Sequence, residues 1–242
     1  MKRANTHLYG NRVGKVYWFV KRFGLLQLFS KTLGMLFAPL IIYLKGTHTF
    51  VAEGQAFALF YHRYNTTWAN ERAVEIPLAR SFIDSHPGRL LEVGNVLSHY
   101  FPASWDILDK FEKGSRVINE DILSFKPRQK YVTIVSISTF EHIGYDDESD
   151  ESADKIVLAY RNIVDNCLAP KGAFFMTTPI NYNPHMDKII NTNAFGFESL
   201  HFLKRVSRNA WKQVSKEQAL RCRYGYPFSY GNCIAIGIYE KR

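Results

Sequence analysis

The feature that most constrains this chain is an alternation of short apolar runs with helical patterns over residues 74–242. The clearest run, residues 130–139, is rich in β-branched side chains, which favour a strand. Five further runs have the same character: residues 89–94, 104–111, 115–125, 173–179 and 233–241. Between them, residues 73–86 and 154–168 repeat apolar side chains at helical spacing. This order predicts a doubly wound α/β fold, with a mostly parallel sheet and helices on both faces.

Charge divides the chain into three parts. The formal net charge is +9, yet residues 1–50 hold eight basic side chains and no acid, and the central residues 51–199 carry a net charge of −6. We predict a basic, apolar helical extension over residues 1–50, an aromatic-rich lid or hairpin over residues 51–73, and the main domain over residues 74–242. Because the basic ends flank an acidic module without a nucleic-acid-binding motif, we do not expect nucleic acid as a partner.

The N-terminal extension is the most apolar part of the chain. Its longest run without a charge, residues 32–44, has 13 residues, which is short of the roughly 20 that a membrane-spanning helix needs. Two interpretations stay open: residues 1–46 lie on an anionic membrane surface, or they pack on the main domain or a second subunit. Three cysteines, without the close spacing of a zinc site, indicate a reducing compartment. We therefore expect a cytoplasmic protein, with peripheral membrane contact under the first interpretation.

Five sequence motifs follow one another along the predicted domain. They read LLEVGNVLSHY, DILDKFE, INEDILSF, VTIVSISTFEHIG and LAPKGAFFMTTP. Together, over about residues 74–190, they resemble the class I methyltransferases that use S-adenosylmethionine. The resemblance implies a Rossmann-like sheet with this cofactor at the carboxyl ends of the strands. The glycine-rich turn of that family is degenerate here, because Val96 and Ser98 stand where small residues are expected.

The resemblance also implies which residues contact the cofactor. Gly94 lets the backbone turn tightly after the first strand, and Glu92 matches an acid near the methionine portion. Asp109 matches the acid that accepts the ribose hydroxyls, and Asp121 the acid that receives the adenine amino group. The full set of expected cofactor contacts is Glu92, Gly94, Asn95, Asp109, Asp121, Ile122 and Ser136. The alternative is that the glycine merely ends a strand and the acids cap helices. This explains each position singly, but it explains the whole series less readily.

The expected catalytic pair is Glu141 and His142, which follow the longest strand. A neutral histidine can take the proton from a hydroxyl as its oxygen attacks the methyl group. The alternative is that His142 packs beneath the cofactor and Glu141 holds a backbone amide. We expect methyl transfer to an oxygen of a small-molecule or glycan-type acceptor.

Two polar aromatic segments are candidates for the acceptor site. The first supplies Tyr61, His62, Tyr64 and Trp68 before the main domain, and the second supplies Asn181 and Tyr182 after residues 173–179. The first segment could equally fill a gap between the extension and the core. The acidic run of residues 146–154 lacks the spacing of a calcium loop, so we expect helix-capping acids there and no metal site.

Three other functions remain open at this level. A nicotinamide-dependent oxidoreductase would have a fuller glycine fingerprint than this chain has. A catalytically silent, membrane-peripheral binding module is compatible with the degenerate turn. Nucleic-acid binding ranks last, for the reason given above.

Overall fold

The computed structural model describes residues 16–17, 20, 24–146 and 153–242 of the 242. Its main sheet has eight strands in the order β5-β4-β3-β6-β7-β10-β8-β9. The strands are β3 (Leu90–Val93), β4 (Asp106–Leu108), β5 (Val117–Ile118), β6 (Tyr131–Ile137), β7 (Leu168–Pro179), β8 (Ser199–Ser207), β9 (Ala210–Val214) and β10 (Cys233–Glu240). The five strands from β5 to β7 are parallel, whereas β10 runs antiparallel between β7 and β8, and β9 runs antiparallel to β8. The predicted mostly parallel sheet is confirmed.

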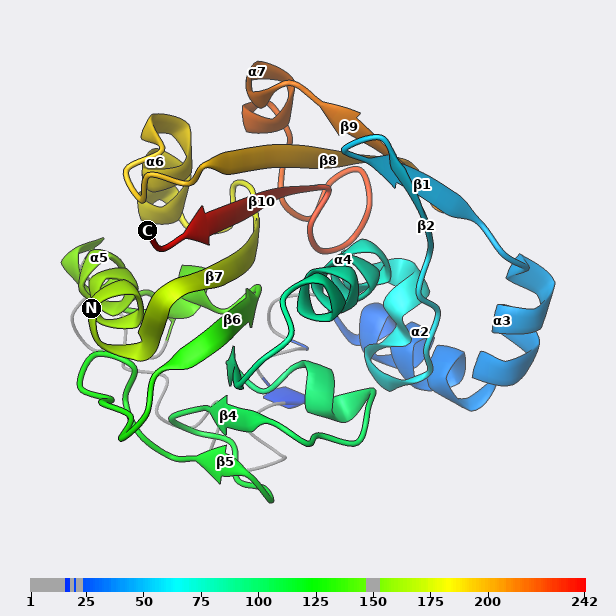
Figure 1. The fold of residues 1–242 in the computed structure, drawn as a ribbon. Coiled ribbons are helices and arrows are strands. Elements are labelled where there is room, and N and C mark those ends of the chain that lie inside the picture. Colours follow the sequence, from blue (N-terminus) through cyan, green and yellow to red (C-terminus); the bar gives the residue numbers. More distant parts are fainter. Residues whose placement is uncertain (1–15, 18–19, 21–23, 147–152) are drawn as a thin grey trace.

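Helices cover both faces of this sheet, as predicted. They are α4 (Arg72–Ser85), α5 (Ala153–Asn162), its continuation η4 (Ile163–Cys167), α6 (Pro184–Thr192) and the short α7 (Lys216–Leu220). Figure 1 shows α4 on one side of the sheet and α5 with α6 on the other. Val135 and Ile137 of β6 belong to the α4 core, while Ile134 belongs to the α5–α6 core. The central strand is thus buried on both faces, which explains its continuous apolar run.

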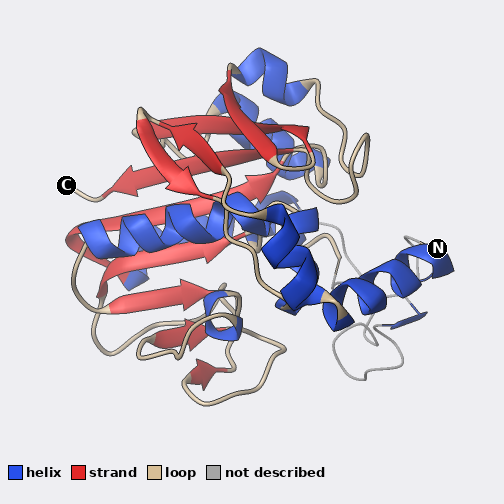
Figure 2. Cartoon of the chain, turned by 90° about the vertical axis from the view of Figure 1, so that its right-hand side faces the viewer, coloured by secondary structure: helices blue, strands red, loops and turns tan. Residues whose placement is uncertain are grey.

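The N-terminal helices lie outside these layers, beyond α4 (Figures 1 and 2). They are α2 (Leu25–Leu36) and α3 (Ala38–Lys45), and a two-stranded sheet follows from β1 (Thr49–Ala52) and β2 (Gln55–Ala58). The 3-10 segment η1 (Tyr64–Ala69) then leads into α4. Among the described residues no single helix is long and apolar enough to cross a membrane. The bent pair Leu28–Leu36 and Ala38–Lys45, taken together, has the length and composition of a membrane-spanning segment.

Some elements differ from the sequence-based expectation. Within residues 94–130 the links joining β3, β4, β5 and β6 carry only the 3-10 turn η2 (Leu97–His99), because Pro102, Gly114 and Pro127 interrupt helical continuity. The strands β8 and β9 and the helices α6 and α7 were not predicted. Most of the acidic run of residues 146–154, and most of the basic residues of the extension, lie outside the described residues.

Candidate functional site

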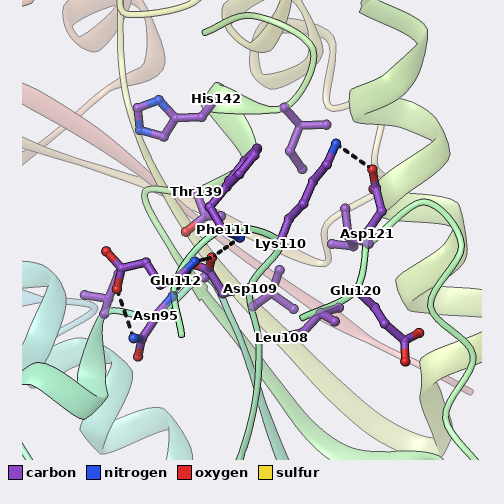
Figure 3. Close-up of a pocket in the computed structure, with 15 residues that line it drawn as sticks. Asn95, Leu108, Asp109, Lys110, Phe111, Glu112, Glu120, Asp121, Thr139 and His142 are labelled. Atoms are coloured by element: carbon purple, nitrogen blue, oxygen red, sulfur yellow. Dashed lines mark hydrogen bonds and ion pairs between the residues drawn. The ribbon is translucent and has the colours of Figure 1, made fainter. Parts of the chain in front are cut away.

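A cavity opens at the carboxyl ends of β3, β4, β5 and β6 (Figure 3). This is the edge at which a doubly wound sheet binds its ligands. The residues that line it are Val93, Gly94, Asn95, Val96, Leu108, Asp109, Lys110, Phe111, Glu112, Glu120, Asp121, Ile122, Thr139, His142 and Ile143. The structure therefore brings six of the nine expected cofactor and catalytic residues around one space. The other three, Glu92, Ser136 and Glu141, do not line it.

Gly94 makes the turn after β3 possible. Its φ of 83° lies in the left-handed region, and a Cβ there would lie 2.2 Å from Oγ1 of Thr139. Its amide donates to the Leu108 carbonyl at 2.9 Å. No other residue type fits this position without displacing Thr139, so the floor of the cavity depends on this glycine.

Asp109 organises the second wall of the cavity. One carboxylate oxygen accepts from the amides of Phe111 (2.8 Å) and Glu112 (2.7 Å), and the other accepts from the Asn95 amide at 3.1 Å. A carboxylate has about four acceptor positions, so about one remains for a ligand hydroxyl. The Asn95 side chain in turn donates to Glu112 at 3.0 Å, which ties the turns after β3 and β4 together.

Asp121 is held by a lysine that the sequence analysis did not single out. Its carboxylate lies 2.9 Å from Nζ of Lys110 and accepts from the Leu123 amide at 2.9 Å. Figure 3 shows the Lys110 side chain extended toward Asp121. Although partial burial opposes it, the Leu123 amide and Lys110 hold the pKa of Asp121 below its usual value. Ile122 beside it contributes apolar surface to the same wall.

Glu92 and Ser136 do not line the cavity, contrary to expectation. The Glu92 carboxylate is fully buried and accepts from the amides of Val96 (2.7 Å) and Leu97 (2.5 Å) and from the indole of Trp105 (2.8 Å). It therefore fixes the turn that bears Gly94 from within the protein. The Ser136 hydroxyl is also buried and donates to the Val93 carbonyl at 3.2 Å. Both residues act on the shape of the site rather than on a ligand.

His142 lies on the cavity wall, in the 3-10 turn η3 (Phe140–His142) after β6. Its Nδ1 is 2.5 Å from a carboxylate oxygen of Asp146, and the Tyr182 hydroxyl donates to the same oxygen. Burial opposes protonation, but Asp146 and Glu141 together raise the pKa of His142 above its usual value. A proton on Nδ1 satisfies Asp146 and leaves Nε2 as an acceptor.

Asp146 is a site residue that sequence reasoning missed. We had assigned it to a run of helix-capping acids, whereas the structure places it four residues after His142, against the imidazole. The signal was present in the sequence, since a histidine and an acid four residues apart can meet on one turn. A carboxylate behind an imidazole fixes its tautomer and orientation, as in a catalytic triad.

Glu141 points away from the cavity into the protein. It is 1% exposed, and one of its carboxylate oxygens has no hydrogen-bond partner among the described residues. Its other oxygen is 3.8 Å from Nε2 of His142. Burial raises the pKa of Glu141 to about 7. The structure thus places it near Nε2 of His142 and outside the cavity lining.

A cluster of buried charges lies beyond Glu141. Arg72 pairs with Glu75, whose other carboxylate oxygen accepts from the Ser138 hydroxyl at 2.6 Å. Glu71 accepts from the Gly231 amide at 2.9 Å, and burial together with Glu75 raises its pKa. Glu71 and Arg72, at the start of α4, thus belong to a buried ionic cluster next to the β6 end.

Two threonines at the end of β7 complete this region. Thr177 and Thr178 are fully buried, and their hydroxyls have no hydrogen-bond partner in the part of the chain that the structure describes. Thr177 pairs in register with Ile137, the last residue of β6. A buried hydroxyl without a partner is costly. Neither threonine lines the strand-end cavity.

The residues expected at the acceptor site fall into separate groups. Tyr64 stacks on His99 at 4.5 Å between ring centroids, and His62 contacts Tyr100 at 5.3 Å. His99 lies 3.1 Å from Glu112 of the cavity wall, so these rings adjoin the cavity. The Tyr182 ring lies 5.0 Å from His142.

The other three lie apart from the cavity. Trp68 contacts a separate basic cavity beside α2. Tyr61 is covered by the Lys45 ammonium at 5.6 Å, and its buried hydroxyl has no partner among the described residues. Asn181 donates to the carbonyls of Leu220 and Cys222 before β10. These contacts are structural, and the structure does not bring Tyr61, Trp68 or Asn181 to the strand-end cavity.

The arrangement of the sheet decides the fold type. A parallel core is followed by antiparallel C-terminal strands, with the cavity at the carboxyl ends of the parallel strands. The chain therefore has the doubly wound, Rossmann-like α/β fold that the sequence predicts, extended by antiparallel C-terminal strands. No protein-family model matches the sequence, and no curated protein matches it.

Solved structures with a related architecture have low identity to this chain. One is the N-methyltransferase NodS from Bradyrhizobium japonicum in complex with S-adenosyl-L-homocysteine, at 12% identity and a TM-score of 0.48, over 71% of this chain and 87% of that one. Another is the Burkholderia thailandensis 1,6-didemethyltoxoflavin-N1-methyltransferase with its ligand and S-adenosylhomocysteine, at 13% identity and 0.45, over 81% and 98%.

The cavity fits S-adenosylmethionine on its own chemistry. Among the described residues, four carboxylates line it, from Asp109, Glu112, Glu120 and Asp121, against a single lysine, so the site favours a cation. Apolar side chains, from Leu108, Phe111, Ile122 and Ile143, offer surfaces for an aromatic base. The remaining acceptor position of Asp109 suits a ribose hydroxyl. The site holds no lysine-bearing phosphate loop of the kind that binds nucleotides.

Proposed function

We propose that this chain transfers a methyl group from S-adenosylmethionine to an oxygen of a small-molecule or glycan-type acceptor. The observation that carries the proposal is the Asp146–His142 pair on the wall of an acidic cavity at the carboxyl ends of the strands. The cofactor, when bound, supplies an electrophilic methyl group on a sulfonium. Asp109, the backbone around Gly94 and the apolar wall at Ile122 would hold it.

The proton transfer belongs to His142. Asp146 holds the imidazole through Nδ1, and Nε2 is then the atom that removes the acceptor's proton. The hydroxyl of Tyr182 donates to Asp146 and restrains it from the other side.

The presence of a histidine base, His142, is an argument for an oxygen acceptor over an amine. An unprotonated amine already presents a lone pair to the methyl group, whereas an alcohol becomes a strong nucleophile only as it loses its proton. A histidine oriented by a carboxylate is therefore of more use for a hydroxyl. The same pair would be less important for a nitrogen acceptor.

Calorimetric titration with S-adenosylmethionine, and with a nicotinamide dinucleotide as control, tests the cofactor. Binding of the first alone supports the proposal, and binding of the dinucleotide alone would replace it with an oxidoreductase. Saturable binding of neither would leave the silent-module alternative.

Transfer of a labelled methyl group to panels of hydroxylated and amine compounds tests the acceptor. His142→Gln should lower kcat about a hundredfold while leaving the cofactor Kd unchanged. Asp146→Asn should lower kcat less and shift the acid limb of its pH profile, because Asp146 raises the pKa of His142. Labelling of amines alone, with no effect of His142→Gln, would contradict oxygen transfer.

We also propose that the protein is peripheral on a membrane, at an anionic surface. The support is a row of apolar side chains on α2 that face solvent at helical spacing: Leu25, Phe29, Leu33 and Leu36, each at least 60% exposed. Sedimentation of the full chain with anionic vesicles tests this. Phe29→Ser combined with Leu36→Ser should abolish sedimentation, and unchanged sedimentation would contradict it.

A further inference from the structure

A second cavity, unrelated to methyl transfer, lies between the N-terminal helices and the antiparallel end of the sheet. Its described lining is Ser30, Lys31, Gly34, Lys45, Thr66, Trp68, Ala69, Arg205, Arg208, Pro227, Phe228, Ser229 and Tyr230. Four of these side chains are basic and none is acidic. We call it the basic cavity, and it encloses about 430 Å³.

Arg205 is the most informative residue of the basic cavity. It is 5% exposed, and its four guanidinium hydrogen bonds go to the carbonyls of Trp68, Ala69, Ser207 and Arg208. A guanidinium has five donors, so one donor and the full positive charge are left for another acceptor. A buried cation that is bonded only to neutral oxygens is costly unless an anion joins it.

Two lysines bring further charge to the same space. Lys31 donates to Asn65 at 2.9 Å, and Lys45 donates to Asn209 at 2.5 Å. These two acceptors are neutral side-chain amides. Burial lowers the pKa of Lys31 and of Arg205, and the charge of Glu71 opposes that shift in both. The segments that supply these cations come from α2, α3 and the end of β8, so the fold assembles the basic cavity from distant parts of the chain.

The cations have the chemistry that binds a phosphate. A phosphate offers several acceptor oxygens and a charge of about −1 to −2, and arginine with lysine is the usual combination that holds it. The hydroxyls of Ser30, Thr66 and Ser229 lie in the same lining. A single carboxylate would offer fewer acceptors to four cations.

The surroundings of the basic cavity indicate where that phosphate comes from. Helix α2 contributes Ser30, Lys31 and Gly34 to the cavity and exposes Phe29 and Leu36, each 72% exposed, to solvent. Helix α3 likewise contributes Lys45 and exposes Leu40 and Leu44. Cations and apolar side chains on the same helices match a lipid, whose phosphate and acyl chains adjoin each other.

We propose that the basic cavity binds the phosphate headgroup of a membrane lipid while α2 and α3 rest on the acyl region. This inference rests on the proposed peripheral membrane location and adds to it a defined headgroup site. It is independent of the methyl-transfer proposal. The lipid phosphate neutralises Arg205, Lys31, Lys45 and Arg208, and its binding fixes the N-terminal helices against β8.

Sedimentation of the full chain with phosphatidylcholine vesicles containing phosphatidic acid is the primary test. Lys45→Gln combined with Arg208→Gln should weaken binding roughly thirtyfold, at about one factor of five per basic residue. Lys126→Gln combined with Arg128→Gln, a change of equal charge on exposed residues after β5, is the matched control and should weaken it less than about twofold. Vesicles that take the same surface charge from oleate, a carboxylate, should bind more weakly than those with phosphatidic acid.

A second measurement separates a lipid from a soluble phosphate. Inorganic phosphate should raise the Tm of the wild type and of Phe29→Ser/Leu36→Ser, but not that of Lys45→Gln/Arg208→Gln. The Phe29/Leu36 variant should at the same time lose vesicle binding. Retained vesicle binding in that variant would overturn the acyl contact of α2. A Tm increase with inorganic phosphate, without vesicle binding by the wild type, would overturn the lipid and leave a soluble phosphate ligand.

Three further outcomes would overturn the headgroup site itself. They are equal vesicle binding by the cavity variant and the wild type, equal binding to phosphatidic acid and oleate vesicles, and an equal Tm increase in the cavity variant. Vesicle binding that survives in the cavity variant would leave the peripheral location standing without this site. Absence of vesicle binding by the wild type would contradict both the peripheral membrane location and the lipid headgroup site.

Discussion

Carboxylates stand on both sides of the β6 end, and their surroundings give them opposite properties. Asp109 and Asp121, on the cavity side, are partly exposed and are held by backbone amides and by Lys110. Glu71 and Glu141, on the interior side, are buried, and burial raises the pKa of each. The comparison shows that an acid's burial and partners decide the direction of its pKa shift, which is downward for Asp121 and upward for Glu71 and Glu141. The predictions below test this division.

The largest effect should come from the interior side. Arg72→Met leaves Glu71 and Glu75 buried without their cation, so we expect a loss of about 3–5 kcal/mol in the free energy of unfolding. Because the pKa of Glu71 is raised, the loss should be smaller at acidic pH, where the carboxyl is neutral. Urea denaturation measures it. Arg80→Met on the same helix, whose 3.8 Å contact with Asp84 is exposed, is the control at below about 1 kcal/mol. Equal losses in the two variants would contradict the buried cluster.

Glu141 should make stability depend on pH. Its native pKa, about 7, lies above the ordinary 4.5, so the protonated form stabilises the fold below about pH 4.5 and this stability is lost as the pH rises to 7. Glu141→Gln cannot ionise and should exceed the wild type by up to about 3 kcal/mol above pH 7. Denaturation at a series of pH values checks this.

Asp121→Asn should show the opposite pH dependence of stability. The pKa of Asp121 is lowered, so its contribution is present above the ordinary carboxyl range and disappears as the pH falls. The wild type should therefore exceed this variant at neutral pH and match it in acid. If the stability difference from the wild type changed with pH in the same direction in Glu141→Gln and Asp121→Asn, the distinction between interior and cavity carboxylates would be wrong.

The sequence predicted one side of this comparison better than the other. Asp109 and Asp121 follow strands, and strand ends meet at one edge of a parallel sheet, so pattern alone placed them at the cavity. The Glu141–Arg72 region depends on how α4 packs on β6, which no local pattern encodes. Glu92 illustrates the limit, because it lies within β3 and its side chain turns inward to the amides of Val96 and Leu97.

The antiparallel end of the sheet was harder still to predict from the sequence. The sequence of β8, SLHFLKRVS, mixes charged and apolar residues because one side is only half-buried, so it lacks the apolar run that marks β6. The basic cavity combines Arg205 of that strand with Lys31 and Lys45 of the N-terminal helices. Such a site exists only after folding, although the basic ends of the sequence had already indicated an anionic partner. The reducing, cytoplasmic location stays a prediction.

On the cavity side, Asp109→Ala should weaken S-adenosylmethionine binding about tenfold to a hundredfold. The variant loses one or two charge-assisted hydrogen bonds and the amide contacts that shape the turn after β4. Calorimetric titration measures the Kd, and circular dichroism verifies the fold. Asp84→Ala, an exposed change on α4, is the control. Unchanged affinity in Asp109→Ala would exclude it from cofactor binding.

The smallest effect should come from Lys110, the one lysine on the cavity wall. Lys110→Gln removes the partner of Asp121 and leaves the four cavity carboxylates to attract a cationic cofactor. Because the ion pair is partly exposed, the change in binding free energy should stay below about 1 kcal/mol, a gain in affinity of at most about fivefold. The gain should shrink as salt is added. Lys113→Gln, in the same loop but outside the cavity, should have no effect. A loss of affinity in Lys110→Gln would mean that the lysine itself contacts the cofactor, and the acidic character of the cavity would then not be what selects its ligand.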